Sequence, residues 1–152
     1  MIDSVGTDQT IDLAAIYPKW AILDNRTGYQ GYLVQPSNLI QFATAVRDDL
    51  GYDYLSSVTG VDYLPDGKME VVYHVYKTIG GLPIVFKVQV PREQAVVPSL
   101  VSVYPGADFQ EREAWDLLGI RFDAHPDLRR ILLWEGFAGH PLRKDWHEPY
   151  YE

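Results

Sequence analysis

The chain has 152 residues, 47% of them hydrophobic and 22% charged, a composition typical of one globular domain rather than of a disordered chain. Its formal net charge of −8 argues against nucleic acid as a partner, because phosphate binding needs a clustered positive surface. The absence of cysteine excludes disulfides, thiol nucleophiles and cysteine-ligated iron–sulfur or zinc sites.

The N-terminal stretch is polar. Residues 1–15 lack the basic and apolar regions of a secretory signal, and no apolar run in the chain has the length of a membrane span. We therefore expect a protein that faces the cytosol and reaches a membrane only indirectly, through a partner.

The first helix is predicted between Pro36 and Gly51, with Ser37 as its N-cap. Apolar residues recur along this segment at helical spacing, namely Leu39, Phe42, Ala43, Val46 and Leu50. One apolar stripe predicts a helix that lies on a sheet.

Three strands are predicted next, over residues 52–63, 70–77 and 83–90, with turns at 65–67 and 80–81. Along the last strand the residues alternate, with Ile84, Phe86, Val88 and Val90 on one face and Lys87 and Gln89 on the other. This alternation predicts an antiparallel meander with one covered face and one wetter face.

A second helix is predicted from Asp108 to Gly119. Asp108 at the N-cap and Glu111 three residues later form a capping-box pattern, and Arg112 and Asp116 are four residues apart and can pair. The buried stripe is expected to consist of Ala114, Trp115, Leu117 and Leu118.

The chain around this helix is predicted to be less regular. Residues 97–100 are expected to start a short helical turn, and prolines and glycines preclude long regular elements after Ile120. The prediction is an α+β fold in one domain, 1–152, with an antiparallel or mixed sheet and helices on one face. Residues 1–120 form its compact core, and residues 121–152 form an extended docking tail that is held only if something lies beneath it.

No catalytic, cofactor-binding or metal-binding residue is predicted. Glu111 and Glu113 are two apart on a helix, so they point to different sides and cannot flank one bond. The four histidines lack metal-ligand spacing. His125 and His140 each precede a proline, and a hydrogen bond from the ring to a neighbouring carboxylate or carbonyl is favoured over proton transfer.

The basic pairs Arg129-Arg130 and Arg143-Lys144 could grip phosphate or simply be exposed. The apolar run 131–134, which follows the first pair and ends in Trp134, favours a third interpretation, because arginines beside tryptophan are typical anchors of protein interfaces. Charge agrees with this: residues 1–66 have nine acidic and three basic residues (−6), whereas residues 121–145 have five basic and four acidic residues (+1). The segment therefore predicts a surface where an acidic module docks.

Two motifs in this segment carry a resemblance to a known family. Glu111-Arg112-Glu113, Asp116-Leu117-Leu118, His125, Arg129 and Ile131-Leu132, with their spacing, form the first motif, and residues 139–145 (GHPLRKD) form the second. Both resemble the 30 kDa subunit (the C subunit, or the J subunit of the chloroplast-type complex) of respiratory complex I, the proton-pumping NADH:quinone oxidoreductase. The match is specific over 107–146 and consistent in element order over 36–106.

The resemblance implies a subunit of the peripheral arm with no redox centre of its own, on the cytoplasmic face of the membrane. Its partners would be the 49 kDa-type quinone-site subunit and the iron–sulfur subunits, so NADH, FMN, iron–sulfur clusters and quinone would be bound by other chains. The interface and structural residues that it implies are Glu111, Arg112, Asp116, His125, Arg129, Arg130, Trp134, His140, Arg143, Lys144 and Asp145.

Two alternatives remain open at this point. One is the equivalent subunit of a related membrane-bound hydrogenase or formate hydrogenlyase complex, which uses a similar module. The other is a free-standing enzyme that uses Glu113, His125 and Arg129, although their spacing gives no reason for them to converge.

Overall fold

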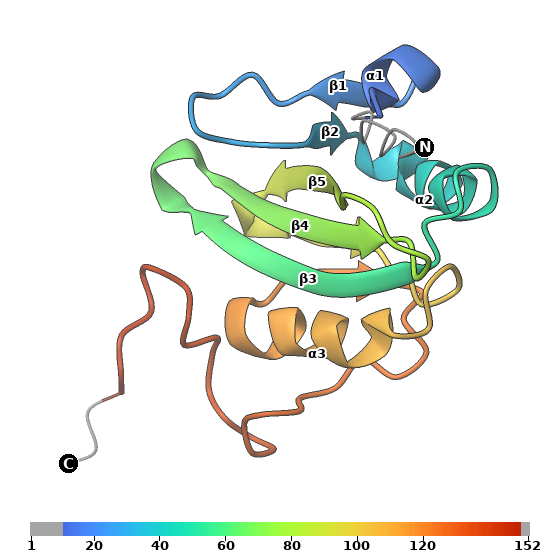
Figure 1. Ribbon diagram of the computed structural model, residues 1–152. Helices are drawn as coiled ribbons and strands as arrows, with labels where there is room; N and C mark the ends of the chain where they lie inside the picture. The colour runs from blue at the N-terminus through green and yellow to red at the C-terminus, as the bar shows by residue number, and fades with distance from the viewer. Residues whose placement is uncertain (1–10, 150–152) are drawn as a thin grey trace, which may run out of the picture.

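The centre of the fold is a five-stranded mixed sheet with the strand order β1-β2-β5-β4-β3 (Figure 1). A computed structural model describes residues 11–149. The predicted meander is present, since β4 pairs antiparallel with both β3 and β5, while β2 pairs antiparallel with β1 and parallel with β5. The strands of this sheet are β1 (Ala21–Leu23), β2 (Tyr32–Val34), β3 (Tyr54–Tyr63), β4 (Lys68–Tyr76) and β5 (Ile84–Pro91). A separate parallel pair consists of β6 (Val96–Pro98) and β7 (Arg121–Asp123).

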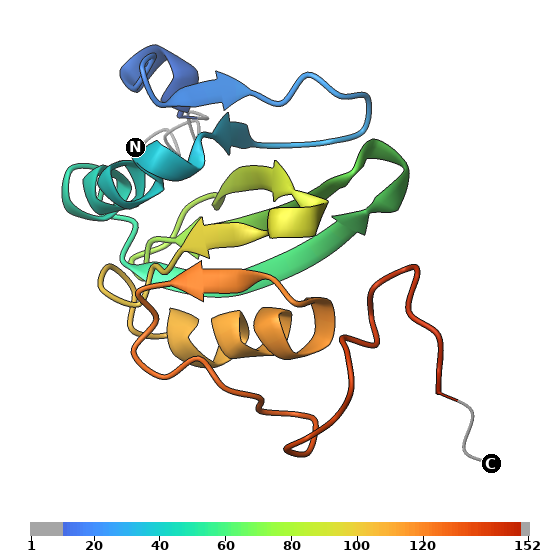
Figure 2. The same cartoon turned by 180° about the vertical axis from the view of Figure 1, so that it is seen from behind.

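The helices are α1 (Leu13–Ile16), α2 (Leu39–Asp48) and α3 (Ala107–Leu118), with short 3₁₀ turns η1 (Pro36–Asn38), η2 (Leu64–Asp66) and η3 (Arg92–Gln94). Two of them, α2 and α3, pack on the same face of the sheet. The ring of Phe42 in α2 meets Phe86 edge-on, with 5.1 Å between ring centres. α3 runs along β3 (Figures 1 and 2). The predicted α+β fold, with its helices on one face, is therefore confirmed.

A glycine in β3 sets how closely α3 approaches the sheet. A Cβ atom at Gly60 would lie 2.5 Å from Cδ1 of Leu118 and 3.0 Å from Cδ1 of Ile120, both inside normal contact distance. The absence of a side chain at this position lets the helix lie directly on the strand, as is typical of glycine within a strand.

The core beneath α2 is aromatic. Tyr73 stacks on Phe86 with ring centres 5.1 Å apart, and Phe42, Tyr73 and Phe86 are all fully buried. Each such side chain stabilises the fold by roughly 1.5–3 kcal/mol through removal of apolar surface from water. The hydroxyl of Tyr73 has no hydrogen-bond partner among the described residues, and burial raises its pKa.

The opposite face of the sheet, which was predicted to be the more solvent-exposed one, is buried at one position. Lys87 is buried, because its ammonium donates to Oδ2 of Asp24 at 2.7 Å. Arg26 bridges the carboxylates of Asp24 and Glu70, so the connection between β1 and β2, residues 24–31, folds across this face. The alternation predicted for β5 is present, but ion pairs from a distant connection cover its polar side.

Both predicted helix starts need correction. α2 begins at Leu39, after the η1 turn, so Ser37 lies in η1 and does not cap the helix. α3 begins at Ala107 with Gly106 at the N-cap, which places Asp108 inside the first turn. The predicted capping box does not form, because the carboxylate of Glu111 binds elsewhere in the fold.

Of two other predicted boundaries, one is confirmed and one is wrong. Gly119 ends α3 as predicted, in the left-handed conformation with φ of 75°. The helical turn expected at residues 97–100 is wrong at its start, since Val96–Pro98 form strand β6 beside β7. A β-branched pair at 96–97 favours the extended conformation over a helical turn.

Candidate protein-docking site

The predicted tail, residues 121–152, begins too early, because Arg121–Asp123 form strand β7 and Phe122 is buried in the core. The described chain beyond β7 is irregular, and the molecule itself holds it in place. Between Ala124 and Pro149 the described chain contains no helix or strand, and it runs along α3 before passing away from it (Figures 1 and 2). We call residues 124–149 the C-terminal segment. Most of the hydrogen bonds that hold it are made with α3, either with buried side chains of the helix or with the carbonyls at its C-terminal end.

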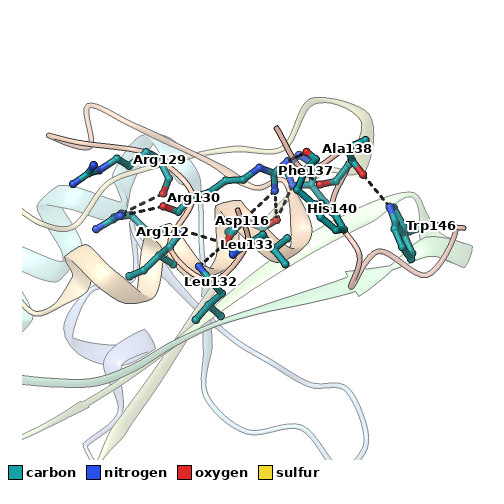
Figure 3. Close-up of polar contacts among 12 residues, drawn as sticks. Arg112, Asp116, Arg129, Arg130, Leu132, Leu133, Phe137, Ala138, His140 and Trp146 are labelled. Atoms are coloured by element: carbon teal, nitrogen blue, oxygen red, sulfur yellow. Dashed lines mark hydrogen bonds and ion pairs between the residues drawn. The ribbon is translucent and has the colours of Figure 1, made fainter. Parts of the chain in front are cut away.

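Asp116 is the centre of this anchoring (Figure 3). Its side chain is fully buried, and one oxygen, Oδ2, accepts the backbone N–H groups of Ile131, Leu132 and Leu133 at 3.1, 2.8 and 2.9 Å. The other oxygen, Oδ1, accepts from the guanidinium of Arg130 at 2.8 Å. One carboxylate thus fixes three successive backbone groups of the C-terminal segment.

Burial by itself raises the pKa of Asp116, because it penalises the charged form. The hydrogen bonds from Arg130 and from the three backbone N–H groups outweigh burial, so the pKa lies below its ordinary value. The ionised carboxylate is therefore the form that holds the segment.

Two arginines hold the segment through backbone carbonyls. Arg112 does so from α3, and Arg130 does so from within the segment, where its Nη1 also donates to the carbonyl of Asp116 in α3 at 3.1 Å. Arg130 donates from Nη2 to the carbonyls of Phe137 and Gly139, both at 2.9 Å. Arg112 donates to the carbonyls of Arg129 and Arg130, both at 3.2 Å. The predicted pairing of Arg112 with Asp116 is therefore wrong: Arg112 serves carbonyls, and Asp116 pairs with Arg130.

The C-terminal segment also caps the end of α3. A helix leaves its last four carbonyls without partners in the helix. Here His140 Nδ1 donates to the carbonyl of Asp116 at 2.9 Å, the N–H of Leu142 donates to Leu117 at 2.9 Å, and Arg143 Nε donates to Leu118 at 2.7 Å. The basic groups Arg130 and Arg143 lie at the negative end of the helix dipole, where cations are favoured.

Gly119 makes this cap possible. It has a left-handed φ, and a Cβ atom there would lie 2.7 Å from Cδ2 of His140 and 3.1 Å from Nη2 of Arg143. The ring of His140 in turn lies against Trp115, with ring centres 5.1 Å apart.

A second anchor holds the far end of the segment against the sheet. Arg92, which is buried, forms a two-point ion pair with Asp62 at 2.7 and 3.0 Å and also binds Asp145 at 3.0 Å. The N–H of Lys144 donates to the same Asp62 carboxylate at 2.8 Å. Arg92 and Asp62 were absent from the predicted site, since they lie in η3 and β3, far from the segment in sequence.

His125 anchors the beginning of the segment. Its Nδ1 accepts the N–H of Asp127 at 2.9 Å, so Nε2 carries the proton and faces Oδ1 of Asp108 at 3.0 Å. The neighbouring Glu111 is buried and accepts from Ser99 at 2.6 Å and from the N–H of Leu100 at 2.7 Å. Glu113 is exposed, so the two glutamates do not share one site.

The predicted site residues therefore divide into two groups. Most fix the chain to itself: Glu111, Arg112, Asp116, His125, Arg130, His140, Arg143 and Asp145, of which only Asp145 is exposed, at 52%. The others, Arg129, Trp134 and Lys144, are exposed to solvent.

Apolar side chains emerge from the anchored segment. Leu132, Trp134 and Leu142 are 59, 65 and 58% exposed. The ring of Phe137 lies 4.9 Å from that of Trp134 and 6.1 Å from that of Trp146. We call these five side chains the apolar ridge. Trp134 and, within the apolar run 131–134, Leu132 are predicted from the sequence. The exposure of Leu142 and the half-buried positions of Phe137 and Trp146 depend on which way the anchored backbone turns.

Stability is expected to depend on pH in two opposed ways. The hydrogen bonds of Arg92 hold the pKa of Asp62 below its ordinary value, and the pKa of Asp116 is also lowered. Such carboxylates stabilise the fold above their unfolded pKa of roughly 4, and this is lost as the pH falls through the folded pKa. Burial raises the pKa of Glu111, so its contribution is lost as the pH rises from the unfolded towards the folded pKa.

We therefore expect the free energy of unfolding, from urea titrations between about pH 2 and about pH 8, to rise to a maximum and then decline. In Glu111→Gln the decline on the neutral side should disappear. A curve of the unmodified protein that rises without a maximum would contradict this assignment.

Ala124 offers a stabilising substitution. Its φ is +62°, and among the described residues it is the only one other than glycine in the left-handed region. This conformation costs a residue with a side chain roughly 1–2 kcal/mol. Ala124→Gly should raise the free energy of unfolding by about 0.5–1 kcal/mol, since glycine's greater unfolded-state freedom offsets part of the gain. Ala138→Gly, at a position without positive φ, is the control and should not stabilise; equal effects would refute the strain argument.

The described residues form neither a metal-binding cluster nor a membrane-spanning helix. Within residues 11–149 no group of three or more His, Asp or Glu side chains could hold a metal ion. None of the helices in that range is long and apolar enough to span a membrane.

Fold and site together define an α+β domain with a self-anchored C-terminal segment that exposes an apolar ridge. A family model described as "Respiratory-chain NADH dehydrogenase, 30 Kd subunit" matches residues 32–152. The chain belongs to this family, which confirms the resemblance of its two motifs.

Individual relatives agree with this assignment. The C subunit of the NADH-quinone oxidoreductase of Moorella thermoacetica is 44% identical over 115 residues, 75% of this chain and 78% of that protein. One of the C subunits of Rhizobium meliloti is 40% identical over 78% of this chain and 66% of its own length. The C subunit of Mesorhizobium japonicum is 47% identical over 74% of this chain, but the match spans only 57% of that protein.

Two solved structures are similar in fold. A trypsin-resistant fragment of Nqo5 is 30% identical, with a TM-score of 0.57 over 69% of this chain and 86% of that one. A chain of the membrane-bound sulfane sulfur reductase, an archaeal respiratory membrane complex, reaches a TM-score of 0.75 over 89% of this chain and 81% of its own. At 21% identity, the second likeness concerns the fold alone.

Proposed function

We propose that this chain is a structural subunit, without chemistry of its own, in the peripheral arm of a proton-translocating NADH:quinone oxidoreductase. Its C-terminal segment would dock against the quinone-site (49 kDa-type) subunit, near the iron–sulfur subunits. NADH, FMN, the iron–sulfur clusters and quinone would then be bound by those other chains. The chain would lie at the cytoplasmic face of the membrane and associate with it only through the complex.

The observation that carries this proposal is the apolar ridge on a segment that is already anchored. An irregular chain that must order itself on binding loses affinity through conformational entropy. Here the hydrogen bonds to Asp116 and the helix cap hold the backbone before any partner arrives. Exposed Trp134 and exposed Arg129, five residues apart in this segment, are of the residue types that most often dominate binding energy at interfaces.

The two groups of site residues would then have different roles. Asp116, Arg130 and His140 act as positioning residues that shape the segment. Trp134, Arg129 and Lys144 supply contacts to the partner. An Ala substitution of an inward residue should change both stability and assembly, whereas an Ala substitution of an outward residue should change assembly alone.

The test replaces the resident subunit in its native membranes with a tagged Trp134→Asp variant. We expect the isolated variant to keep its thermal unfolding midpoint within a few degrees, because an exposed side chain changes stability by less than about 0.5 kcal/mol. Recovery of the quinone-site subunit with the tagged chain should fall at least about tenfold. Ile79→Asp is the matched control, because Ile79 is 92% exposed but lies in the connection between β4 and β5.

Full assembly with Trp134→Asp would refute docking through the ridge. The same purification of the unmodified tagged chain tests the choice of complex. Recovery of quinone-site, iron–sulfur and NADH-binding subunits supports the proposal, whereas a nickel-binding large subunit would replace it with a hydrogenase complex.

A further inference from the structure

The strand β1 forms the edge of the sheet opposite to β3, and therefore opposite to α3 and the C-terminal segment. Although it has only three residues, it exposes two successive apolar side chains, Ile22 at 62% and Leu23 at 57%. Successive residues of a strand point to opposite faces, so this edge is apolar on both sides. β1 also precedes residue 32, where the match to the family model begins.

The backbone of β1 has hydrogen-bonding groups that point away from the sheet. Asp24 donates its N–H to the carbonyl of Gly31 at 2.9 Å, which makes these two residues a hydrogen-bonded pair of the β1–β2 ladder. Such pairs alternate along an antiparallel ladder, so Ile22 also bonds towards β2 while Leu23 points its N–H and C=O outward. The N–H of Ala21, which points the same way, is already bound to the carbonyl of Tyr17.

Each face of β1 borders a recess. On the face of Ile22 the recess has a volume of about 170 Å³, and its apolar lining includes Pro18, Trp20, Ile22 and Leu33. On the face of Leu23 the recess has a volume of about 550 Å³ and is lined by residues that include Ile11, Leu23, Tyr32 and Leu82. Among the described residues, the charged side chains that line these recesses are Lys19 in the first and Lys77 in the second.

We propose that an extended strand of another subunit pairs with the edge of β1 that no described strand covers, an inference that rests on the proposed membership of a complex. The outward N–H and C=O of Leu23 would supply the main-chain hydrogen bonds, and alternate side chains of the added strand would meet Ile22 on one face and Leu23 on the other. The matching strand is apolar on both faces and carries acidic residues that complement Lys19 and Lys77. This contact lies at the opposite edge of the sheet from the apolar ridge, so it does not depend on the docking of the C-terminal segment.

The test uses the complex purified from native membranes, with the tagged full-length chain in place of the resident subunit. A photo-cross-linking p-benzoylphenylalanine replaces Ile22, and mass spectrometry identifies the cross-linked peptides. We expect one cross-link, to an apolar segment of another subunit that contains an acidic residue.

Backbone pairing is tested with two substitutions of Leu23. Leu23→Pro removes the outward N–H. It breaks no bond to β2, because this N–H points away from β2, and proline is tolerated at the solvent side of an edge strand. It should lower the cross-link yield at least about tenfold. Leu23→Thr keeps the N–H and loses apolar area, so the yield should fall only about two- to threefold. An undiminished yield in Leu23→Pro would overturn strand addition.

Lys19→Glu keeps the test decisive if Leu23→Pro lowers the thermal stability of the isolated chain. It should reduce the cross-link yield at least about threefold, by reversing the charge beside the added strand. An unchanged yield would overturn the acidic partner. Cross-links to residues 1–10 of this chain or to a second copy, or no cross-link at all, would also overturn the proposal. Because the cross-linked chain keeps Trp134, recovery of partner subunits with it measures membership of the complex separately from the cross-link.

Discussion

Asp116→Asn is expected to lower the free energy of unfolding by about 3–5 kcal/mol and to release the C-terminal segment from α3. An amide has one acceptor oxygen, whereas Asp116 uses both carboxylate oxygens, one for three backbone N–H groups and one for Arg130. Whichever way the amide turns, an N–H group must face another donor inside the protein.

Urea unfolding gives the change in stability, and amide hydrogen exchange gives its location. The amides of Ile131, Leu132 and Leu133 should exchange at least about a hundredfold faster in Asp116→Asn, whereas those of β4 should follow only the global loss of stability. Asp127→Asn is the matched control, because Asp127 pairs with Arg129 in solvent with both side chains more than half exposed. It should change stability by less than about 0.5 kcal/mol.

Arg92→Met is expected to destabilise the protein by about 3 kcal/mol and to free the distal part of the C-terminal segment, including Asp145 and Trp146. Arg92 lies between two carboxylates, and its removal leaves Asp62 buried without a cation. The aliphatic part of methionine replaces the packing of the arginine stem, so the loss reports on the charge rather than on a cavity.

Asp62 should then show its changed surroundings in its titration. The hydrogen bonds from Arg92 are the largest cause of its lowered pKa, so its pKa should rise in Arg92→Met, as followed by carboxyl carbon NMR. Arg129→Met, the same substitution at an exposed arginine of the segment, should leave stability within about 0.5 kcal/mol. Equal losses from the two substitutions would show that the buried ion pair is not the anchor.

The regular elements could be predicted because their signals are local. The meander and its two turns follow from alternation and from Gly67 and the Gly80-Gly81 pair, and the end of α3 follows from Gly119. The predicted capping box of α3 is wrong, because a side chain that can cap a helix can equally bind elsewhere. Glu111 binds Ser99 and the N–H of Leu100 once β6 lies beside α3.

The candidate site could be predicted only in part, for a related reason. Charged residues spaced along a helix are typical of a solvated surface, yet three of those in α3 are buried. The C-terminal segment binds Arg112 and Asp116, whereas Glu111 binds Ser99 and Leu100. Arg92 and Asp62 could not be placed with the site, since their contacts with Asp145 and Lys144 span 53 and 82 residues of sequence.

The order of side chains along the chain was enough to establish most of the regular elements, the family motifs and the lack of long regular elements in the described chain after Ile120, because each follows from propensity and short-range spacing. Which charges point inward and which apolar side chains remain outside was decided only when the C-terminal segment folded back over α3. Burial and pairing depend on contacts between residues far apart in sequence, and the same carboxylate is a surface charge or a buried anchor according to what covers it. Asp116 became an anchor for three backbone amides in this way, and Trp134, the next residue along the chain, remains exposed.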